Sequence, residues 1–467
     1  MPIVSIPIVG PTYENRSFPV NNQVTQNFHI EVNDQGGEAT ALVPFPGLKS
    51  FATAGTGADR GFGEHAGVGY KVSGSELYSF DSLGATTLIG SIPGGDQCVL
   101  RSDGVNLVIA YGSGKPITWN GTTLTTGSDI DLPNASTVAY INRRVVYDAV
   151  NSDLAFADLD NALSVESNNV TSVNTTPKNT LAVAVQDQQL IVFSEDSITP
   201  YYNSGVGNPP YDVIQNATRR TGLKAIHSIA QNENYIYFLD DTLKISRYAG
   251  LQVQSVSNTS IGRAIQGYSN PESAKGIAFT LDDNNFYCIT FPNQATWLYK
   301  ENVGWTNLAY GAAGAPHLMN SYINLYGKHL VSDRRNGNIY ELDFDTHTDN
   351  GDIIQHRRDT INVNGKTFGR PGSRVFWDRI RLVIEGGTSV ITGQGSNAKV
   401  TMAYSDNFGN TFGPERAIST GQQGEYGYEL TWEGLGESYN RVFRFTMYEP
   451  VKCVFIGLSA DIELESL

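Results

Sequence analysis

Between Gly67 and Asp343 the chain returns repeatedly to one kind of short segment, in which aromatic or aliphatic residues alternate with polar ones. The segments are centred on Tyr78, Trp119, Phe156, Tyr202, Tyr248, Tyr299 and Tyr340, at separations of 41, 37, 46, 46, 51 and 41 residues. A period of roughly 40 to 50 residues, with about four short strands in each, is typical of β-propeller blades. The repeat therefore predicts a propeller of seven blades, although the uneven spacing also allows six.

The interior of the repeats has the order strand, polar turn, buried strand, turn and outer strand. Residues 97–101 lead through a Ser-Asp-Gly turn into the apolar run 105–111, and residues 226–230 lead through a polar turn into 235–239. Such an order suits a blade, because each blade hides its faces only against its neighbours.

Composition points to the same fold class. The chain has 48 Gly, 24 Tyr and 20 Phe, and only 17% of its residues are charged. This balance favours many short strands joined by turns, so we expect an all-β protein with almost no long helix. Its 467 residues exceed one ordinary core, which predicts two domains or one large repetitive domain.

A change of pattern marks a second domain. After the Gly/Pro-rich junction at 366–372, apolar side chains occupy alternate positions, as in Ile380, Leu382 and Ile384, which is the pattern of half-buried strands. About 95 residues of such strands suggest a compact β-sandwich. We therefore divide the chain into an extended N-terminal arm (1–50), a β-propeller (51–365) and a C-terminal β-sandwich (366–467).

The first 50 residues contain six prolines and little periodicity, which predicts an arm that runs over a surface rather than folding alone. The N-terminus lacks a basic region, and no apolar run reaches the length of a membrane span. We expect no signal peptide and no membrane insertion, and a protein that is made in a cytoplasm and stays soluble.

The net charge of −15 excludes a protein that grips nucleic acid by neutralising phosphates, because that mode needs clustered Lys and Arg. The nearest approach to such clusters is a set of arginine pairs, which we interpret as solvated turn or interface residues: 143–144, 219–220, 334–335 and 357–358. An acidic wall would instead let DNA slide past without specific binding.

Few residues suggest chemistry. Cys98, Cys288 and Cys453 are widely separated and odd in number, which predicts buried reduced thiols rather than disulfides or a metal site. The seven histidines lack metal-ligand spacing, and no nucleophile elbow or phosphate-binding loop is present. We predict no enzyme activity, with no catalytic residue, no cofactor and no metal ligand.

Four acidic or polar turns are candidate sites. The turn from Asp343 to Asp352 could offer oxygen ligands to Ca²⁺ but lacks EF-hand spacing, so a hydrogen-bonded turn is favoured and the metal question stays open. The pairs Asp240-Asp241 and Asp282-Asp283 fit hairpin turns better than a glycosidase funnel. The segment 405–412 is similar to the Asp-box of sialidases, a structural turn, with Asn407 in the Asp position and Phe412 in place of Trp.

Three patches together resemble one protein family. They are residues 332–351 (SDRRNGNIYELDFDTHTDNG), the segment 404–412 followed by Arg416, 421–428 and 441–444, and the N-terminal stretches 26–28 and 41–51. In order and spacing they resemble the packaged-DNA stabilisation or tail-hub (nozzle) proteins of short-tailed bacteriophages, nearly end to end.

This resemblance implies a structural component of the virion tail, assembled in the host cytoplasm. It implies a homo-hexameric ring below the portal and adaptor that extends the DNA channel and helps to retain packaged DNA. Tail needle, tip, fibre or tailspike proteins are the further partners that it implies. The docking surface, the particular tail proteins and the host stay open.

Two alternatives remain from other classes. One is a propeller-fold enzyme that acts on glycans through a funnel of carboxylates, with a carbohydrate-binding sandwich. The other is a host-side receptor-binding module or adhesin.

Overall fold

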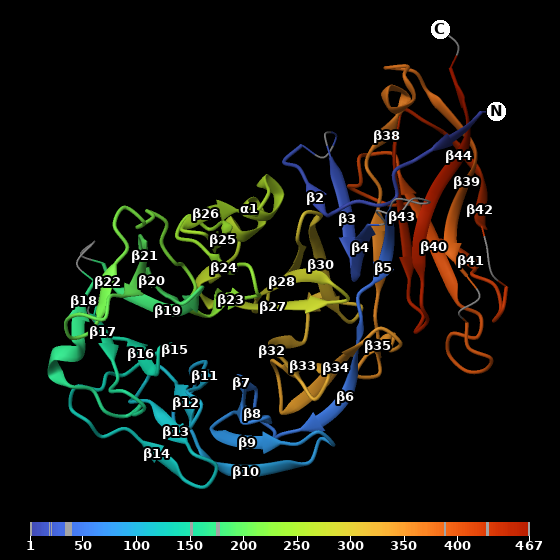
Figure 1. The fold of residues 1–467 in the computed structure, drawn as a ribbon. Helices are drawn as coiled ribbons and strands as arrows, with labels where there is room; N and C mark the ends of the chain where they lie inside the picture. The colour runs from blue at the N-terminus through green and yellow to red at the C-terminus, as the bar shows by residue number, and fades with distance from the viewer. Residues whose placement is uncertain are drawn as a thin grey trace.

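The computed structural model describes residues 2–17, 19, 21–32, 40–149, 153–173, 178–386, 389–425 and 429–465. A ring of small sheets lies beside a separate stack of longer strands, and both chain ends lie at the outer end of that stack (Figure 1). One α-helix, α1 (Thr259–Gln266), occurs among the described residues, together with short 3₁₀ turns η1 (Ser167–Asn169), η2 (Ile226–Ser228), η3 (Pro271–Ser273) and η4 (Gly365–Phe368). The expected all-β class, with almost no long helix, is confirmed.

Seven four-stranded blades form the ring in the described part of the chain; five of them are separate sheets, and two are parts of larger sheets. The first four blades are β7 (Asp59–His65), β8 (Val68–Ser73), β9 (Glu76–Phe80) and β10 (Thr86–Ser91); β11 (Val99–Ser102), β12 (Leu107–Ala110), β13 (Ile117–Trp119) and β14 (Leu124–Thr126); β15 (Val138–Ile141), β16 (Arg144–Asp148), β17 (Asp153–Phe156) and β18 (Val170–Ser172); and β19 (Thr180–Gln186), β20 (Gln189–Ser194), β21 (Ile198–Asn203) and β22 (Tyr211–Val213).

The remaining blades follow the same antiparallel order. They are β23 (Ala230–Gln231), β24 (Ile236–Leu239), β25 (Ile245–Ala249) and β26 (Gln252–Ser255); β27 (Lys275–Leu281), β28 (Asn284–Phe291), β29 (Ala295–Lys300) and β30 (Gly304–Tyr310), to which β31 (Ala315–Pro316) is added; and β32 (Met319–Leu325), β33 (Lys328–Asp333) and β34 (Asn338–Asp343), completed by β6 (Gly47–Thr53).

The seven aromatic anchors of the repeat all lie on equivalent strands. They fall on β9, β13, β17, β21, β25, β29 and β34, which are the third strands of the seven blades counted from the ring's interior. The propeller therefore has seven blades rather than six.

One expected strand is different. Residues 226–230 were expected to form a blade's first strand, but 226–228 form the turn η2 and only Ala230–Gln231 pair, as β23. The hydroxyl of Ser228 donates to Ala225 O at 2.7 Å and accepts the Leu239 amide at 2.9 Å, so a side chain replaces a ladder bond here.

Strand β6 closes the ring. It pairs antiparallel with β34 over Gly47 to Thr53 and parallel with β35 (Thr348–Asp349), which is followed by β36 (Asp352–Ile353). An N-terminal strand thus completes the blade whose other strands come almost 300 residues later. Because it joins the two ends of the propeller, it prevents an open edge.

The C-terminal body is a sandwich of two sheets. One contains β39 (Val375–Glu385), β42 (Glu429–Ser438) and β44 (Val454–Leu464), and the other contains β37 (His356–Asp359), β38 (Val363–Asn364), β40 (Lys399–Ser405), β41 (Arg416–Ser419) and β43 (Asn440–Met447). The alternating residues of β39, Ile380, Leu382 and Ile384, are almost completely buried between the sheets. The predicted sandwich is confirmed.

The N-terminal residues supply strands to both bodies. In the sandwich, β1 (Ile3–Ser5) pairs with β44, and the hairpin of β4 (Phe28–Val32) and β5 (Thr40–Pro44) extends the same sheet. Strand β3 (Asn22–Gln26), paired with β2 (Tyr13–Glu14), lies between β30 of the propeller and β37 of the sandwich. One hydrogen-bonded sheet therefore runs from β27 to β41 and joins the two bodies.

Candidate functional site

The patch at residues 26–28 forms the joint between the bodies. Asn27, which has a positive φ of 58°, donates through Nδ2 to Ala309 O and to Gln355 O at 2.9 Å each, and its Oδ1 accepts the Ala309 amide at 2.7 Å. Phe28 then packs against His356 and Phe455, with ring centroids 5.0 and 5.1 Å apart. One amide side chain thus holds blade six, the arm and the linker to the sandwich together.

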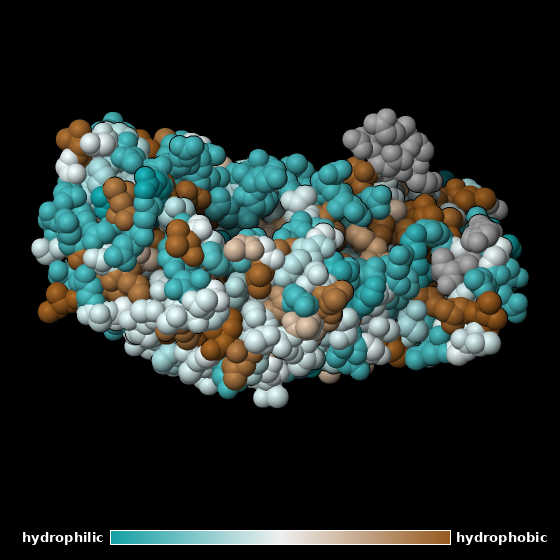
Figure 2. Space-filling model, turned by 60° about the horizontal axis from the view of Figure 1, so that its bottom comes forward, coloured by the Kyte–Doolittle hydropathy of each residue, from teal (hydrophilic) through white to brown (hydrophobic). Residues whose placement is uncertain are grey.

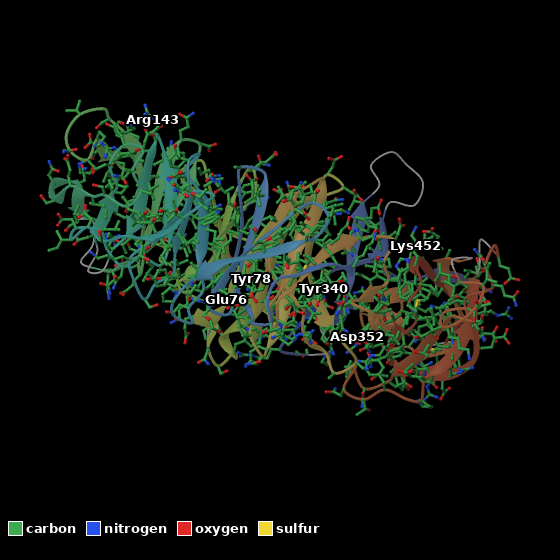
Figure 3. The ribbon with its side chains drawn as sticks, turned by 90° about the horizontal axis from the view of Figure 1, so that it is seen from below. Glu76, Tyr78, Arg143, Tyr340, Asp352 and Lys452 are labelled. Carbon is green, nitrogen blue, oxygen red and sulfur yellow. The ribbon has the colours of Figure 1, made fainter. Side chains whose placement is uncertain are left out.

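The patch at 332–351 closes the propeller. The buried Asp333 carboxylate accepts the Arg335 amide at 2.7 Å and the Tyr340 hydroxyl at 2.8 Å. Figure 3 labels Tyr340 within the propeller, among the strands of its last blade. This network fixes the β33–β34 turn, against which β6 and the first blade pack.

The same turn contacts the first blade directly. Lys71, which is fully buried, donates to Asn336 O at 3.2 Å and to Asn338 O at 2.8 Å. Burial lowers the pKa of Lys71, while Asp59 and Asp333 act in the opposite direction. A Cβ atom on Gly337 would lie 1.9 Å from Gly55 O, so only glycine fits this crossing.

The patch around 404–412 anchors a turn on the sandwich. Asn407 Oδ1 accepts the Thr411 amide at 2.9 Å, as predicted for a capped structural turn. Asp406 is bound by Arg441, whose Nε and Nη2 donate to its two oxygens at 2.7 and 2.9 Å. Arg441 is almost completely buried and lies over Tyr404, 4.1 Å from the ring centroid.

The other members of this patch are structural as well. Arg444 donates to both oxygens of Asp359 at 2.9 Å, and the Trp432 indole donates to Arg416 O at 2.8 Å. Of the segment 421–428, residues 426–428 lie outside the described residues.

The acidic turn after β34 binds its own backbone and neighbours. Asp343 accepts the Asp345 amide at 3.0 Å and the Thr346 hydroxyl at 2.9 Å, and pairs with Lys49 at 3.3 Å. Asp352, labelled in Figure 3 near the start of the sandwich, accepts the Tyr310 hydroxyl. The described residues contain no group of three or more His, Cys, Asp or Glu side chains placed to hold a metal ion.

The adjacent carboxylates elsewhere also form turns. Asp240 Oδ1 accepts the Thr242 and Lys244 amides at 2.9 Å each, and Asp241 accepts the Gly222 amide at 3.0 Å. Asp282 and Asp283 have φ values of 47° and 59° and form the two-residue loop between β27 and β28. The turn interpretation of both pairs is confirmed.

The propeller encloses a central cavity of about 480 Å³, lined by the first strands of its blades. Arg101 and Lys275 line it, and Lys275 donates to Gln97 at 2.7 Å. Among its described lining residues, Glu233 is the one carboxylate, whereas glycosidases use a pair of acids. Burial lowers the pKa of His227 in the wall to about 4. The described lining residues of this cavity therefore do not include a pair of carboxylates.

The arginine pairs form no track. Arg143 pairs with Asp160, and Arg334 donates to His317 O at 3.1 Å. The expectation was solvated turn or interface residues, but Arg358 is completely buried inside the fold, so that interpretation is wrong for this residue. The three cysteines are free and buried, as expected, and burial raises the pKa of Cys98 to about 12.

Arg358 is the structural residue that sequence reasoning missed. Its guanidinium donates to Ile8 O at 2.5 Å, Thr25 Oγ1 at 2.8 Å and Gln23 Oε1 at 2.8 Å, and so fixes the N-terminal arm to β37. Burial lowers the pKa of Arg358 to about 10. The sequence gives no signal for this role, because its partners lie more than 330 residues away.

None of the described helices is long and apolar enough to span a membrane. No curated protein sequence matches the chain. Three solved structures have a low similarity to the chain. The computationally designed Ika8 protein is 11% identical, over 63% of this chain and 99% of its own, with a TM-score of 0.41. Virginiamycin B lyase from Staphylococcus aureus is 10% identical, over 61% of this chain and 94% of its own, with a TM-score of 0.40, and BamB from Moraxella catarrhalis is 9% identical, over 73% and 98%, with a TM-score of 0.38. These TM-scores are too low to support a conclusion about the fold or the function of this chain.

Two family models match the chain and divide it as its two bodies do. The model described as bacteriophage P22 Gp10, beta-propeller, matches residues 4–347, and the model described as bacteriophage P22 Gp10, beta-sandwich, matches residues 362–463. Together with a closed seven-bladed ring joined to a sandwich, these matches show that the chain belongs to the Gp10 family of packaged-DNA stabilisation and tail-hub proteins, structural components of the phage tail.

Proposed function

We propose that this chain forms a homo-hexameric ring below the portal and adaptor of a short-tailed phage, where it extends the DNA channel and helps to retain the packaged genome. The observation that carries this proposal is the match of both bodies to the Gp10 models, over residues 4–347 and 362–463. Closed homo-oligomeric symmetry is how a single kind of chain encloses a channel.

The joint between the bodies supports a mechanical role. A sheet that is continuous from β27 to β41, together with the Asn27 hydrogen bonds, resists bending between propeller and sandwich. A tail component that connects a head to distal tail proteins needs such stiffness. The adaptor on one side, and tail needle, tip, fibre or tailspike proteins on the other, are the proposed partners, with assembly in the host cytoplasm.

DNA is proposed to pass through the ring without specific binding. The net charge is −15, and the arginine pairs are engaged within the fold or dispersed over it. Binding to duplex DNA depends on the number of phosphates neutralised, so affinity at physiological salt is expected to be negligible. Micromolar binding in a filter assay that falls steeply with salt would contradict this part of the proposal.

Light scattering and negative-stain microscopy of the protein, alone and mixed with the adaptor ring, test the assembly. We expect sixfold rings, formed best on the adaptor, because a partner that binds only the assembled state stabilises it. A chain that stays monomeric under both conditions would overturn the proposed ring.

A further inference from the structure

A groove lies where the N-terminal hairpin meets the two bodies. One part, with a volume of about 290 Å³, is lined by the propeller residues Leu281 and Phe286, by Phe344, and by Val43 and Pro44 of β5. A second part, of about 430 Å³, continues along the outer face of the sandwich over Val43, Val454 and Ile456. The two parts share Glu31, Val43 and Lys452, so they form one groove.

The groove exists because β5 and β44 separate. The two strands are paired only at Leu42 and Phe455 among their described residues, whereas β5 is paired with β4 over five residues. Leu42 and Phe455 point into the sandwich core, which leaves Val43 and Ile456 half-buried on the outer face. Figure 3 labels Lys452 at this seam between the blue N-terminal strands and the sandwich.

The apolar floor has an acidic rim. The carboxylates of Glu31, Asp282, Asp345 and Glu385 line the groove, against the single ammonium of Lys452, which pairs with Glu385 at 2.8 Å. Glu31, Asp282 and Asp345 are exposed. Carboxylates gathered beside half-buried aliphatic and aromatic surface favour a cation that carries an apolar stem.

A buried histidine also lines this site. His29 is 4% exposed and lies beside the backbone of Pro44, to which it is hydrogen-bonded. Its ring lies between Phe286 and Phe344, at centroid distances of 5.9 and 6.0 Å. Burial and the nearby Lys300 lower the pKa of His29 to about 3, so the ring is neutral at pH 7. The wall that His29 forms with the two phenylalanines is therefore uncharged at pH 7.

We propose that this groove binds an extended peptide segment of another tail protein, in which arginine or lysine alternates with aliphatic residues. The aliphatic side chains of the peptide lie on Val43, Val454 and Ile456. One of its cationic side chains passes over the rings of Phe286 and Phe344 to the rim carboxylates. The inference rests on the proposed tail-hub function, because it names the chemistry of a partner for that assembly.

Fluorescence anisotropy on the full-length chain tests the groove with a fluorescein-labelled hexapeptide that alternates valine and arginine. We expect saturable binding, and weaker binding of peptides that alternate valine with glutamate or serine with arginine. The double variant Glu31→Gln/Asp345→Asn, which breaks no ion pair recorded among the described residues, is expected to bind the probe about fivefold to tenfold more weakly.

The double variant Glu166→Gln/Asp212→Asn is the matched control, because it removes the same charge from exposed positions on other blades. It should bind the probe like the parent chain. Equal weakening by both variants would show general charge attraction and overturn the groove as the site, as would no binding of the probe at millimolar concentration. Self-association that the probe displaces would also overturn the proposal, since it would identify a second copy of the chain as the occupant.

Failure here is distinguishable from failure of the tail-hub function. If the chain forms rings on the adaptor but the probe does not bind, the groove proposal is wrong and the proposed function stands. If the chain forms no ring on the adaptor, the proposed function fails whatever the probe does.

Discussion

The propeller and the sandwich bury their apolar residues in different ways. Among the described residues, the propeller contains seven apolar clusters, one between each pair of neighbouring blades, whereas the sandwich contains one continuous cluster. The surface drawn in Figure 2 has no comparable division, with teal, white and brown residues mixed over both bodies. The difference lies in the interior.

This difference sets how each body depends on the N-terminal arm. In the propeller, β6 completes one blade and contributes to the two interfaces of that blade, and the apolar clusters of the other interfaces contain no described residue of β6. In the sandwich, Ile6, Ile8, Phe28, Ile30 and Leu42 all enter the single core. Loss of the arm should therefore open the propeller at one seam but disturb the whole sandwich. The reason is that all the residues of a single core pack against one another, whereas each blade packs only against its neighbours.

The largest effect is expected at the propeller seam. Replacing Gly337 with valine places a Cβ 1.9 Å from Gly55 O and forces β6 away from the turn, which should cost about 4 kcal/mol or more. Calorimetry should show the propeller transition at lower temperature. Gly95→Ala is the control, since a Cβ there meets no atom within 4 Å; equal melting of the two variants would contradict a tight seam.

The next effect tests the attachment of the arm to the sandwich. Arg358→Met leaves Ile8 O and Thr25 Oγ1 without their buried donor and should cost about 3 kcal/mol. Limited proteolysis should then cleave the arm before the propeller. Arg370→Met, at an exposed position, should leave cleavage unchanged; if it accelerates cleavage as much, the buried guanidinium does not hold the arm.

A smaller effect depends on pH at the joint. Burial lowers the pKa of His356 to about 3, so between pH 6.5 and 3 the unfolded chain binds a proton there that the folded protein does not. Stability should therefore fall as the pH decreases through this window. His356→Phe should remove on the order of 2 kcal/mol of the loss between pH 7 and pH 5. Parallel melting curves against pH for both proteins would show that His356 is not the group responsible.

The smallest effect should be confined to the sandwich. Asn407→Ala removes the acceptor of the Thr411 amide on an exposed turn and should cost about 0.5 to 1 kcal/mol. Urea unfolding followed by tryptophan fluorescence can measure this change against the nearby control Glu415→Ala. A loss of any glycan-cleaving activity without a change in stability would contradict the structural role.

Much of this fold follows from local pattern. The aromatic anchors predicted seven blades because each marks the third strand of one repeat, and the alternation of Ile380, Leu382 and Ile384 predicted the strand that is β39. The prediction of a strand at 226–228 was wrong because the Ser228 hydroxyl, rather than a backbone carbonyl, accepts the Leu239 amide. The periodicity of the sequence does not encode such a side-chain hydrogen bond. The three family-like patches and the structural turn at 405–412 were found in sequence, but the roles of the other two patches as joint and seam were not.

The sequence by itself determined the repeat, the all-β class, the change to a sandwich pattern and the acidic charge, since each depends on side-chain type and spacing along the chain. Only the tertiary structure decided that β6 completes the last blade, that Arg358 holds the arm, and that β5 and β44 separate to leave a groove. The physical reason is distance along the chain: these contacts join residues hundreds of positions apart, and their energy depends on burial and geometry that exist only after both bodies have formed.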